Sequence, residues 1–152
     1  IKYSDDNMSD EQMKTAAQIA QATEFIEGKD KKYNSEIAQG GGNVSGGQKQ
    51  RLSIARAIAK NPEIFVFDDS FSALDFKTDK TLREALSKKT KEKTVIIVAQ
   101  RISTILNADQ IIVLEEGKVV GKGTHEELMK TSEVYKQISL SQLSEKELGG
   151  EA

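Results

Sequence analysis

The sequence lacks several features that would each point to a particular class of protein. It contains no cysteine, which excludes disulfide bonds and thiolate metal ligands. Its longest apolar runs, residues 95–99 and 111–114, are far shorter than the roughly 20 residues that a membrane-spanning helix needs. No block of basic residues is present and the formal net charge is −2, so nothing indicates a nucleic-acid partner.

The sequence also has no recognisable signal peptide, and it opens on Ile1 rather than on a methionine. We therefore expect this chain to be a piece of a longer protein. Any membrane role would have to come from segments outside these residues.

The 152 residues, 37% of them apolar, are enough for one domain with a real core. Helices are predicted at residues 10–27, 46–60, 78–88, 102–107, 125–129 and 133–143, and strands at 64–67, 94–99, 111–114 and 118–120. The strands at 64–67 and 94–99 are continuous apolar runs, as expected of strands buried on both faces. Strands alternating with helices favour an α/β fold with a parallel sheet.

A Ser-Gly-Gly turn stands directly before the helix at 46–60, within the sequence Asn-Val-Ser-Gly-Gly-Gln at 43–48. The start of a helix offers unpaired backbone N–H groups and the positive end of the helix dipole, and both favour a phosphate. Taken alone, a motif this short is equally well interpreted as a capped loop.

Two carboxylates, Asp68 and Asp69, follow the strand at 64–67. Carboxylates at the C-terminal end of a buried strand suit a hydrated Mg²⁺ beside a nucleotide. The structural alternative for Asp68 is a buried cap on a neighbouring turn, and for Asp75 it is an ordinary turn aspartate. The single histidine, His125, lies in a helix-capping sequence and is interpreted as structural. Arg51 and Arg56 are interpreted as surface residues or members of ion pairs within the domain.

Several motifs together resemble the ATPase domain of ABC transporters. Val44–Gln48 resembles the signature motif, residues 64–69 the Walker B strand, and Ser72–Asp75 the D-loop. Residues 35–41, 99–101 and 115–128 stand where exporters of this family have the X-loop, the switch loop and a closing hairpin with its helix. The likeness is greatest to exporters with fused transmembrane domains, and only to the C-terminal half of their ATPase domain. The chain contains neither a Gly-x-x-x-x-Gly-Lys-Ser/Thr phosphate loop nor the glutamine loop.

The resemblance implies an α/β fold: part of a P-loop NTPase (RecA-like) parallel sheet plus a helical signature subdomain, without the phosphate-loop half. Residues 1–60 would be mostly the helical subdomain, 61–143 the core and 144–152 a tail. It also implies ATP and Mg²⁺ as cofactors, and a second ABC ATPase domain and transmembrane domains as partners, at the cytoplasmic face of the cell membrane.

The resemblance further assigns residue roles. The signature residues Val44, Ser45, Gly46, Gly47 and Gln48 would bind the ATP of the facing domain. Asp68 would hold Mg²⁺ through water, while Asp69 and Gln100 would serve catalysis at this chain's own site. The D-loop residues Ser72, Ala73, Leu74 and Asp75 would orient the facing subunit across the nucleotide.

The chain departs from the family pattern at both catalytic positions. Asp69 stands where the family usually has glutamate, and the lost methylene withdraws the carboxylate by about 1 Å, which can cost on the order of a hundredfold in rate. Gln100 stands where the family usually has histidine, and glutamine cannot take up a proton near neutral pH. The X-loop has Gln39 and Gly40 in place of a Glu-Arg pair. We therefore expect a site that binds ATP but hydrolyses it poorly, in a heterodimer, and an isolated chain that is inactive.

Three other functions remain open from the sequence. A soluble translation-factor ATPase of the same superfamily would carry the same motifs. A chromosome-maintenance ATPase would share the signature and Walker B strand, although a long coiled coil normally precedes them. The third alternative is an interaction module without a nucleotide role.

Overall fold

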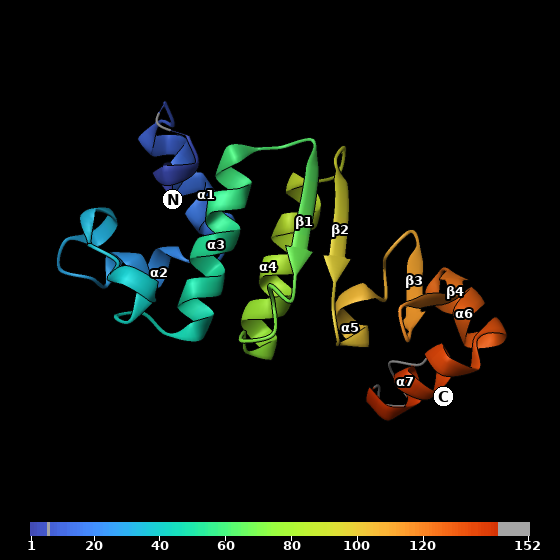
Figure 1. The fold of residues 1–152 in the computed structure, drawn as a ribbon. Coiled ribbons are helices and arrows are strands. Elements are labelled where there is room, and N and C mark those ends of the chain that lie inside the picture. The colour runs from blue at the N-terminus through green and yellow to red at the C-terminus, as the bar shows by residue number, and fades with distance from the viewer. Residues whose placement is uncertain (6, 143–152) are drawn as a thin grey trace. The chain divides into compact units, whose positions relative to one another are not determined.

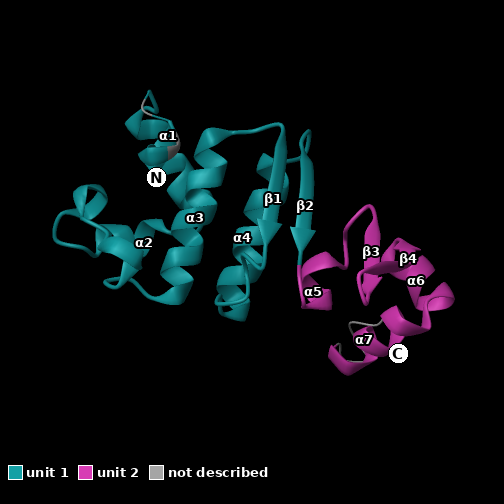
Figure 2. Ribbon diagram, in the orientation of Figure 1, with its two compact units in different colours: residues 1–98 teal, residues 99–152 magenta. Residues whose placement is uncertain are grey.

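The computed structural model describes residues 1–5 and 7–142, which divide into two compact units, residues 1–98 and the part that begins at Ala99 (Figure 1, Figure 2). The first unit contains α1 (Asp10–Ile19), α2 (Thr23–Glu27), α3 (Gly46–Lys60), β1 (Ile64–Asp68), α4 (Phe76–Lys89) and β2 (Thr94–Val98), with short 3-10 turns at Lys2–Ser4, Lys32–Asn34 and Gln39–Gly41. The second unit contains α5 (Ile102–Ile105), β3 (Ile111–Glu115), β4 (Lys118–Gly123), α6 (His125–Thr131) and α7 (Glu133–Gln142).

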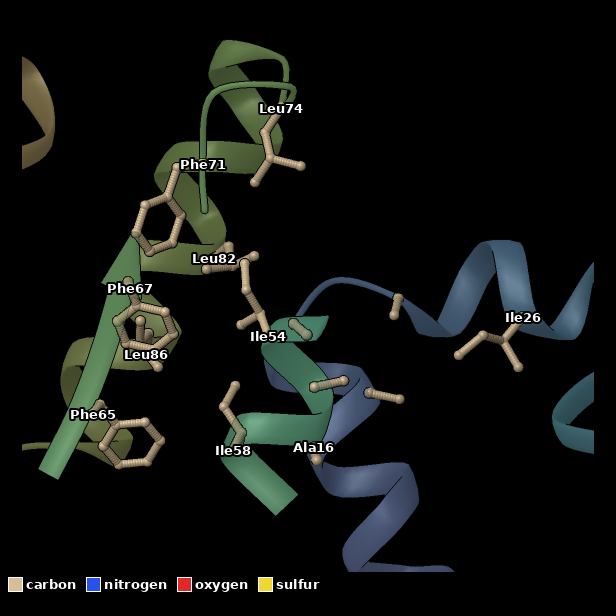
Figure 3. Close-up of a cluster of buried hydrophobic side chains, with 14 residues drawn as sticks. Ala16, Ile26, Ile54, Ile58, Phe65, Phe67, Phe71, Leu74, Leu82 and Leu86 are labelled. Atoms are coloured by element: carbon tan, nitrogen blue, oxygen red, sulfur yellow. The ribbon is translucent and has the colours of Figure 1, made fainter. Parts of the chain in front are cut away.

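Strands β1 and β2 pair in parallel, from Ile64 opposite Thr94 to Asp68 opposite Val98. This arrangement confirms the predicted α/β fold with a parallel sheet. Phe65 and Phe67 of β1 point into the core of the first unit, where their rings stack with centroids 5.8 Å apart. Figure 3 shows the side chains of α3 and α4 that gather around them, among them Ile54 and Leu82.

The prediction that both strands are buried on both faces is wrong. Burial alternates along β1, and one face of the sheet remains exposed. We call this face the uncovered sheet face; its apolar residues are Ile64, Val66, Ile96 and Val98, which are 59, 64, 49 and 55% exposed. The described helices of this unit supply apolar side chains to only one side of the sheet, so every second residue of β1 has nothing to pack against.

The helix predicted over residues 10–27 is broken in the structure. Helix α1 ends in a Schellman motif, in which the Ala22 N–H donates to the Ala17 carbonyl (2.8 Å) and the Gln21 N–H to that of Gln18 (3.0 Å). Gln21 occupies the left-handed position, with φ 55°, that glycine usually fills. Because no glycine stands at this position, the sequence did not indicate the break. Burial of Ala20 and Ala22 holds the two helices in this bent arrangement.

In the second unit, β3 and β4 form the predicted hairpin. Its turn residues Glu116 and Gly117 both have positive φ, 48° and 75°, as a tight hairpin turn requires. Helix α6 begins at a capping box of Thr124 and Glu127, as the predicted start at residue 125 requires, and it continues two residues beyond the predicted end at residue 129. The Ser132 hydroxyl accepts a hydrogen bond from the Tyr135 N–H (3.3 Å) and so caps α7, which begins at residue 133 as predicted.

Within the described residues, no helix is both long and apolar enough to span a membrane. The predicted division near residue 60 falls inside the first unit and remains a prediction, while the predicted tail at 144–152 lies outside the described residues.

Candidate functional site

The turn before α3 is built as a reciprocal cap. The Ser45 hydroxyl accepts from the Gln48 N–H (3.2 Å), and the Gln48 side-chain oxygen accepts from the Ser45 N–H (3.0 Å). These bonds leave the Ser45 O–H and the Gln48 NH₂ group as donors. Among the described residues no partner is found for the N–H groups of Gly46 and Gly47. The turn thus presents hydrogen-bond donors at the positive end of a helix whose first turn has no acidic residue, which is what a phosphate requires.

The D-loop segment lies directly against this turn. A Cβ built on Gly47 would stand 2.9 Å from the Ala73 carbonyl oxygen, so only glycine fits at this position without a shift of backbone. A Cβ on Gly46 would meet only the Ala73 side chain at 3.7 Å, an ordinary contact. Leu74 is buried in the core, and its Cδ2 would stand 3.7 Å from the same Cβ on Gly47. The predicted signature and D-loop residues are therefore neighbours within this chain.

Gln50 is a site residue that the sequence interpretation missed. Its amide NH₂ donates to the Asp69 carbonyl (3.1 Å) and to the Ser72 hydroxyl (3.0 Å), and its amide oxygen accepts from the Ala73 N–H (2.9 Å). Gln50 stands three residues after Gly47, on the same face of the helix. This spacing from Gly47 was the one feature of the sequence that could have indicated a role for Gln50. The residues that Gln50 contacts lie about twenty positions further along the chain, so the local sequence does not show the contact.

Asp68 and Asp69 both lie at the C-terminal end of β1, as predicted, and both are exposed. The alternative of Asp68 as a buried cap is therefore wrong. The Asp69 N–H donates to the Val98 carbonyl (3.0 Å), which extends the parallel ladder by one bond, and the residue adopts a left-handed φ of 46° that aspartate tolerates.

An exposed carboxylate at this strand end fits a magnesium ion that keeps most of its water, since Mg²⁺ beside a nucleotide takes only one or two protein carboxylates. Within residues 1–5 and 7–142 no cluster of three or more His, Cys, Asp or Glu side chains could hold a metal ion by itself. Asp68 is thus able to assist a metal that arrives with phosphate, and the chain shows no self-sufficient metal centre among these residues.

Asp75 has a clear structural role. Its carboxylate accepts from the Thr78 N–H (2.9 Å) and caps α4, and this hydrogen bond lowers the pKa of the Asp75 carboxyl below its usual range. The carboxylate is exposed, so a further contact across a subunit interface remains a proposal.

Gln100 lies in the second unit, in the segment that precedes α5. Its backbone is held by the last residue of α7: the Gln142 amide donates to the Gln100 carbonyl (3.0 Å) and accepts from the Ile102 N–H (2.9 Å). The Gln100 side chain is exposed. Because Asp69 belongs to the first unit, a joint catalytic role for these two residues is a proposal.

The interpretation of Arg51 needs correction. Its guanidinium donates to the carbonyls of Gln21 (2.7 Å) and Gly47 (3.4 Å) and lies over the Phe25 ring at 4.8 Å, so it is a half-buried link between helices rather than a surface or ion-pair residue. Arg56 is exposed, as expected. His125 is structural as predicted, with Nδ1 at 2.9 Å from the Tyr135 hydroxyl.

The segment at 35–41 is fastened to the start of the signature by Asn43. The Asn43 amide donates to the Glu36 carbonyl (2.8 Å) and accepts from the Ala38 N–H (3.0 Å). Gln39 and Gly40 follow within a 3-10 turn in which Gly40 has φ 69°. Both are exposed.

A helix start that presents hydrogen-bond donors and a strand that ends in carboxylates are together typical of nucleotide-binding α/β proteins. A family model described as ABC transporter matches residues 3–72. ATP-binding cassette sub-family B member 5 of Mus musculus is 42% identical over 142 residues, covering 93% of this chain and 11% of that protein. ABC transporter B family member 14 of Arabidopsis thaliana is 45% identical over 140 residues, covering 91% of this chain and 11% of that protein.

Among solved structures, a bacterial Atm1-family ABC exporter with ATP bound matches with a TM-score of 0.88 and 34% identity over 94% of this chain and 25% of that chain. The chain belongs to the ABC transporter family, as a segment of an exporter-type ATP-binding domain with part of the P-loop NTPase fold. It spans between 11% and 25% of the length of these relatives.

Proposed function

We propose that this chain forms part of the ATP-hydrolysing domain of a membrane exporter, and that its signature turn completes the nucleotide site of a second, different ATPase domain. The observation that carries the proposal is the capped turn at Ser45–Gln48, which presents several hydrogen-bond donors and lies against the D-loop segment. The similarity to a bacterial Atm1-family ABC exporter that has ATP bound supports the ligand and the class of process.

The residues of this turn have complementary roles. The Ser45 hydroxyl, the Gly46 and Gly47 N–H groups and the Gln48 amide would donate to the phosphate oxygens of ATP held by the facing domain. Val44, directly before Ser45, is half-buried. Because these donors are fixed by the cap before the phosphate arrives, little reorganisation is needed when charge develops during phosphoryl transfer.

At its own site the chain would bind ATP and hydrolyse it slowly. Mg²⁺, when bound, supplies charge neutralisation on the phosphates, and Asp68 would hold its water shell. The Asp69 carboxylate, one methylene shorter than the family's glutamate, would orient the attacking water poorly, and Gln100 can donate a hydrogen bond but cannot become a cation. A slow site of this kind keeps the two domains together while the partner's site turns over.

The proposed partners follow from this arrangement. They are a second ABC ATPase domain, with both catalytic residues in a heterodimer, and transmembrane domains, with the assembly at the cytoplasmic face of the cell membrane. The proposal includes no nucleic-acid partner, in keeping with the absence of a basic block.

The test is ATPase activity of the full-length assembly that contains this chain. Gly46→Asp places a negative charge where the phosphate would bind, yet its Cβ meets only an ordinary contact and a carboxylate favours a helix start. We expect this variant to lose nearly all turnover while its melting temperature stays unchanged or rises. Asp69→Asn should reduce turnover only modestly.

Two results would contradict the proposal. If Gly46→Asp keeps full turnover, the signature does not serve a nucleotide. If Asp69→Asn is as damaging as Gly46→Asp, this chain's own site is the working one and the asymmetric assignment is wrong.

A further inference from the structure

One side-chain amide, that of Gln50, spans the gap between α3 and the segment from Asp69 to Ala73. Both of its N–H donors are used, on the Asp69 carbonyl and the Ser72 hydroxyl, and its oxygen accepts from the Ala73 N–H. The reverse orientation of the amide would place its oxygen against the Asp69 carbonyl and its NH₂ group against the Ala73 N–H. Only the observed orientation satisfies all three partners, so glutamine is required here by both shape and polarity.

The segment that Gln50 holds begins at Asp69, a proposed catalytic residue, and ends at Ala73, a D-loop residue. At one end the Asp69 backbone is held between two bonds, since its N–H donates to Val98 and its carbonyl accepts from Gln50. At the other end the backbone of Ala73 is also held in position. Its N–H donates to the Gln50 side chain, and its carbonyl oxygen lies so close to Gly47 that no Cβ would fit between them. A displacement of α3 therefore moves Asp69 and Ala73 with it.

We propose that Gln50 is a positioning residue that couples the signature turn, which serves the partner's nucleotide, to Asp69, which serves this chain's own nucleotide, and to the D-loop, which faces the partner. The inference rests on the proposed function and adds a physical link between the two sites. The Ser72 hydroxyl strengthens the link, because it accepts from Gln50 and donates to the same Asp69 carbonyl (3.1 Å), closing a three-membered ring of hydrogen bonds.

The decisive variants separate the two halves of the amide. Gln50→Met keeps the length of the side chain but removes all three bonds. Gln50→Glu keeps the acceptor for the Ala73 N–H and replaces the donors with a carboxylate oxygen that repels the Asp69 carbonyl. Ser53→Ala, an exposed change one turn further along α3, is the matched control.

The functional measurement is steady-state ATPase of the full-length assembly, with kcat and KM determined separately. For Gln50→Met we expect kcat to fall on the order of ten- to a hundredfold with KM close to that of the parent, because the signature turn and the D-loop segment lose their fixed position at the partner's working site while nucleotide binding is retained. Gln50→Glu should show a comparable loss, and Ser53→Ala none. Melting temperatures of all three should remain near that of the parent.

The physical measurement is amide hydrogen exchange of Ala73 by NMR in the 152-residue chain. Exchange at Ala73 should be slow in the parent and in Gln50→Glu, and fast in Gln50→Met. The inference is overturned if kcat of Gln50→Met matches that of Ser53→Ala, if kcat and melting temperature fall together, or if Ala73 exchange is unchanged. Failure of Gly46→Asp to affect turnover would instead reject the proposed function, and Ala73 exchange would still decide whether Gln50 holds the segment.

Discussion

Adding one methyl group to Gly46 or to the adjacent Gly47 should change the stability of the chain by clearly different amounts. At Gly47 the new Cβ would stand 2.9 Å from the Ala73 carbonyl oxygen, whereas at Gly46 its nearest neighbour is a side-chain carbon at 3.7 Å. Both glycines occupy the first turn of α3, so Gly46→Ala and Gly47→Ala gain a similar amount from reduced backbone freedom in the unfolded chain. The comparison of the two variants therefore isolates the close contact.

The magnitude follows from these distances. Replacing a helical glycine by alanine stabilises by roughly 0.5–1 kcal/mol where the site has room, so Gly46→Ala should be neutral or slightly stabilising. At Gly47 the neighbour is backbone fixed by the Gln50 bond and cannot rotate away. Overpacking of this kind costs about 1–3 kcal/mol, and we expect a difference of about that size between the two variants.

The assay is urea unfolding of the chain followed by far-ultraviolet circular dichroism, with the slope of free energy against urea compared between variants. Equal unfolding free energies for Gly46→Ala and Gly47→Ala would refute the reasoning, because they would mean that the D-loop backbone yields without cost. A change in slope would show instead that the variant altered the compactness of one state.

Four further outcomes are expected. Calorimetry of the isolated chain with Mg·ATP should show weak or no binding, because its 152 residues contain no phosphate-loop sequence; micromolar affinity would contradict this. Sedimentation should reveal self-association driven by the uncovered sheet face, and a monomer at every concentration would count against it. Gln142→Leu should speed amide exchange at Ile102, which unchanged protection would disprove. The pKa of the Asp75 carboxyl is lowered in the folded chain, so its contribution to folding stability is present above the ordinary carboxyl pKa and is lost as pH falls through the lower folded-state pKa. In Asp75→Asn the urea midpoint of unfolding should lose this dependence on acid pH.

The sequence predicted those elements whose signals are local. The helix start at Ser45, the stop at Asn61, and the caps at Thr124 and Ser132 all lie within a few residues of the backbone groups they satisfy. The break at Gln21 could not be predicted, because a left-handed turn without glycine depends on the burial of the neighbouring alanines and on tertiary contacts such as the Arg51 bond to the Gln21 carbonyl.

The prediction that the sheet is buried on both faces failed for a different reason. A continuous apolar run shows that every position of β1 is suited to burial, but it does not show which elements are present to cover each face. Likewise the motifs at Ser45–Gln48 and Ser72–Asp75 were identified as separate signals. Their contact through Gln50 was not predictable, since it joins residues 19 to 23 positions apart through one side chain.

The fixed backbone at Asp69 bears on whether its short side chain can be compensated. A forward shift of about 1 Å would bring an aspartate carboxylate to where a glutamate would reach. Such a shift would have to stretch the Asp69 N–H bond to Val98 or the bond from Gln50 to the Asp69 carbonyl, which hold the residue from opposite sides. Its left-handed φ of 46° further limits the conformations that could advance the side chain. The geometry of the first unit therefore supports the proposal of a slow site, because the backbone at Asp69 is not free to move forward and compensate for the shorter side chain.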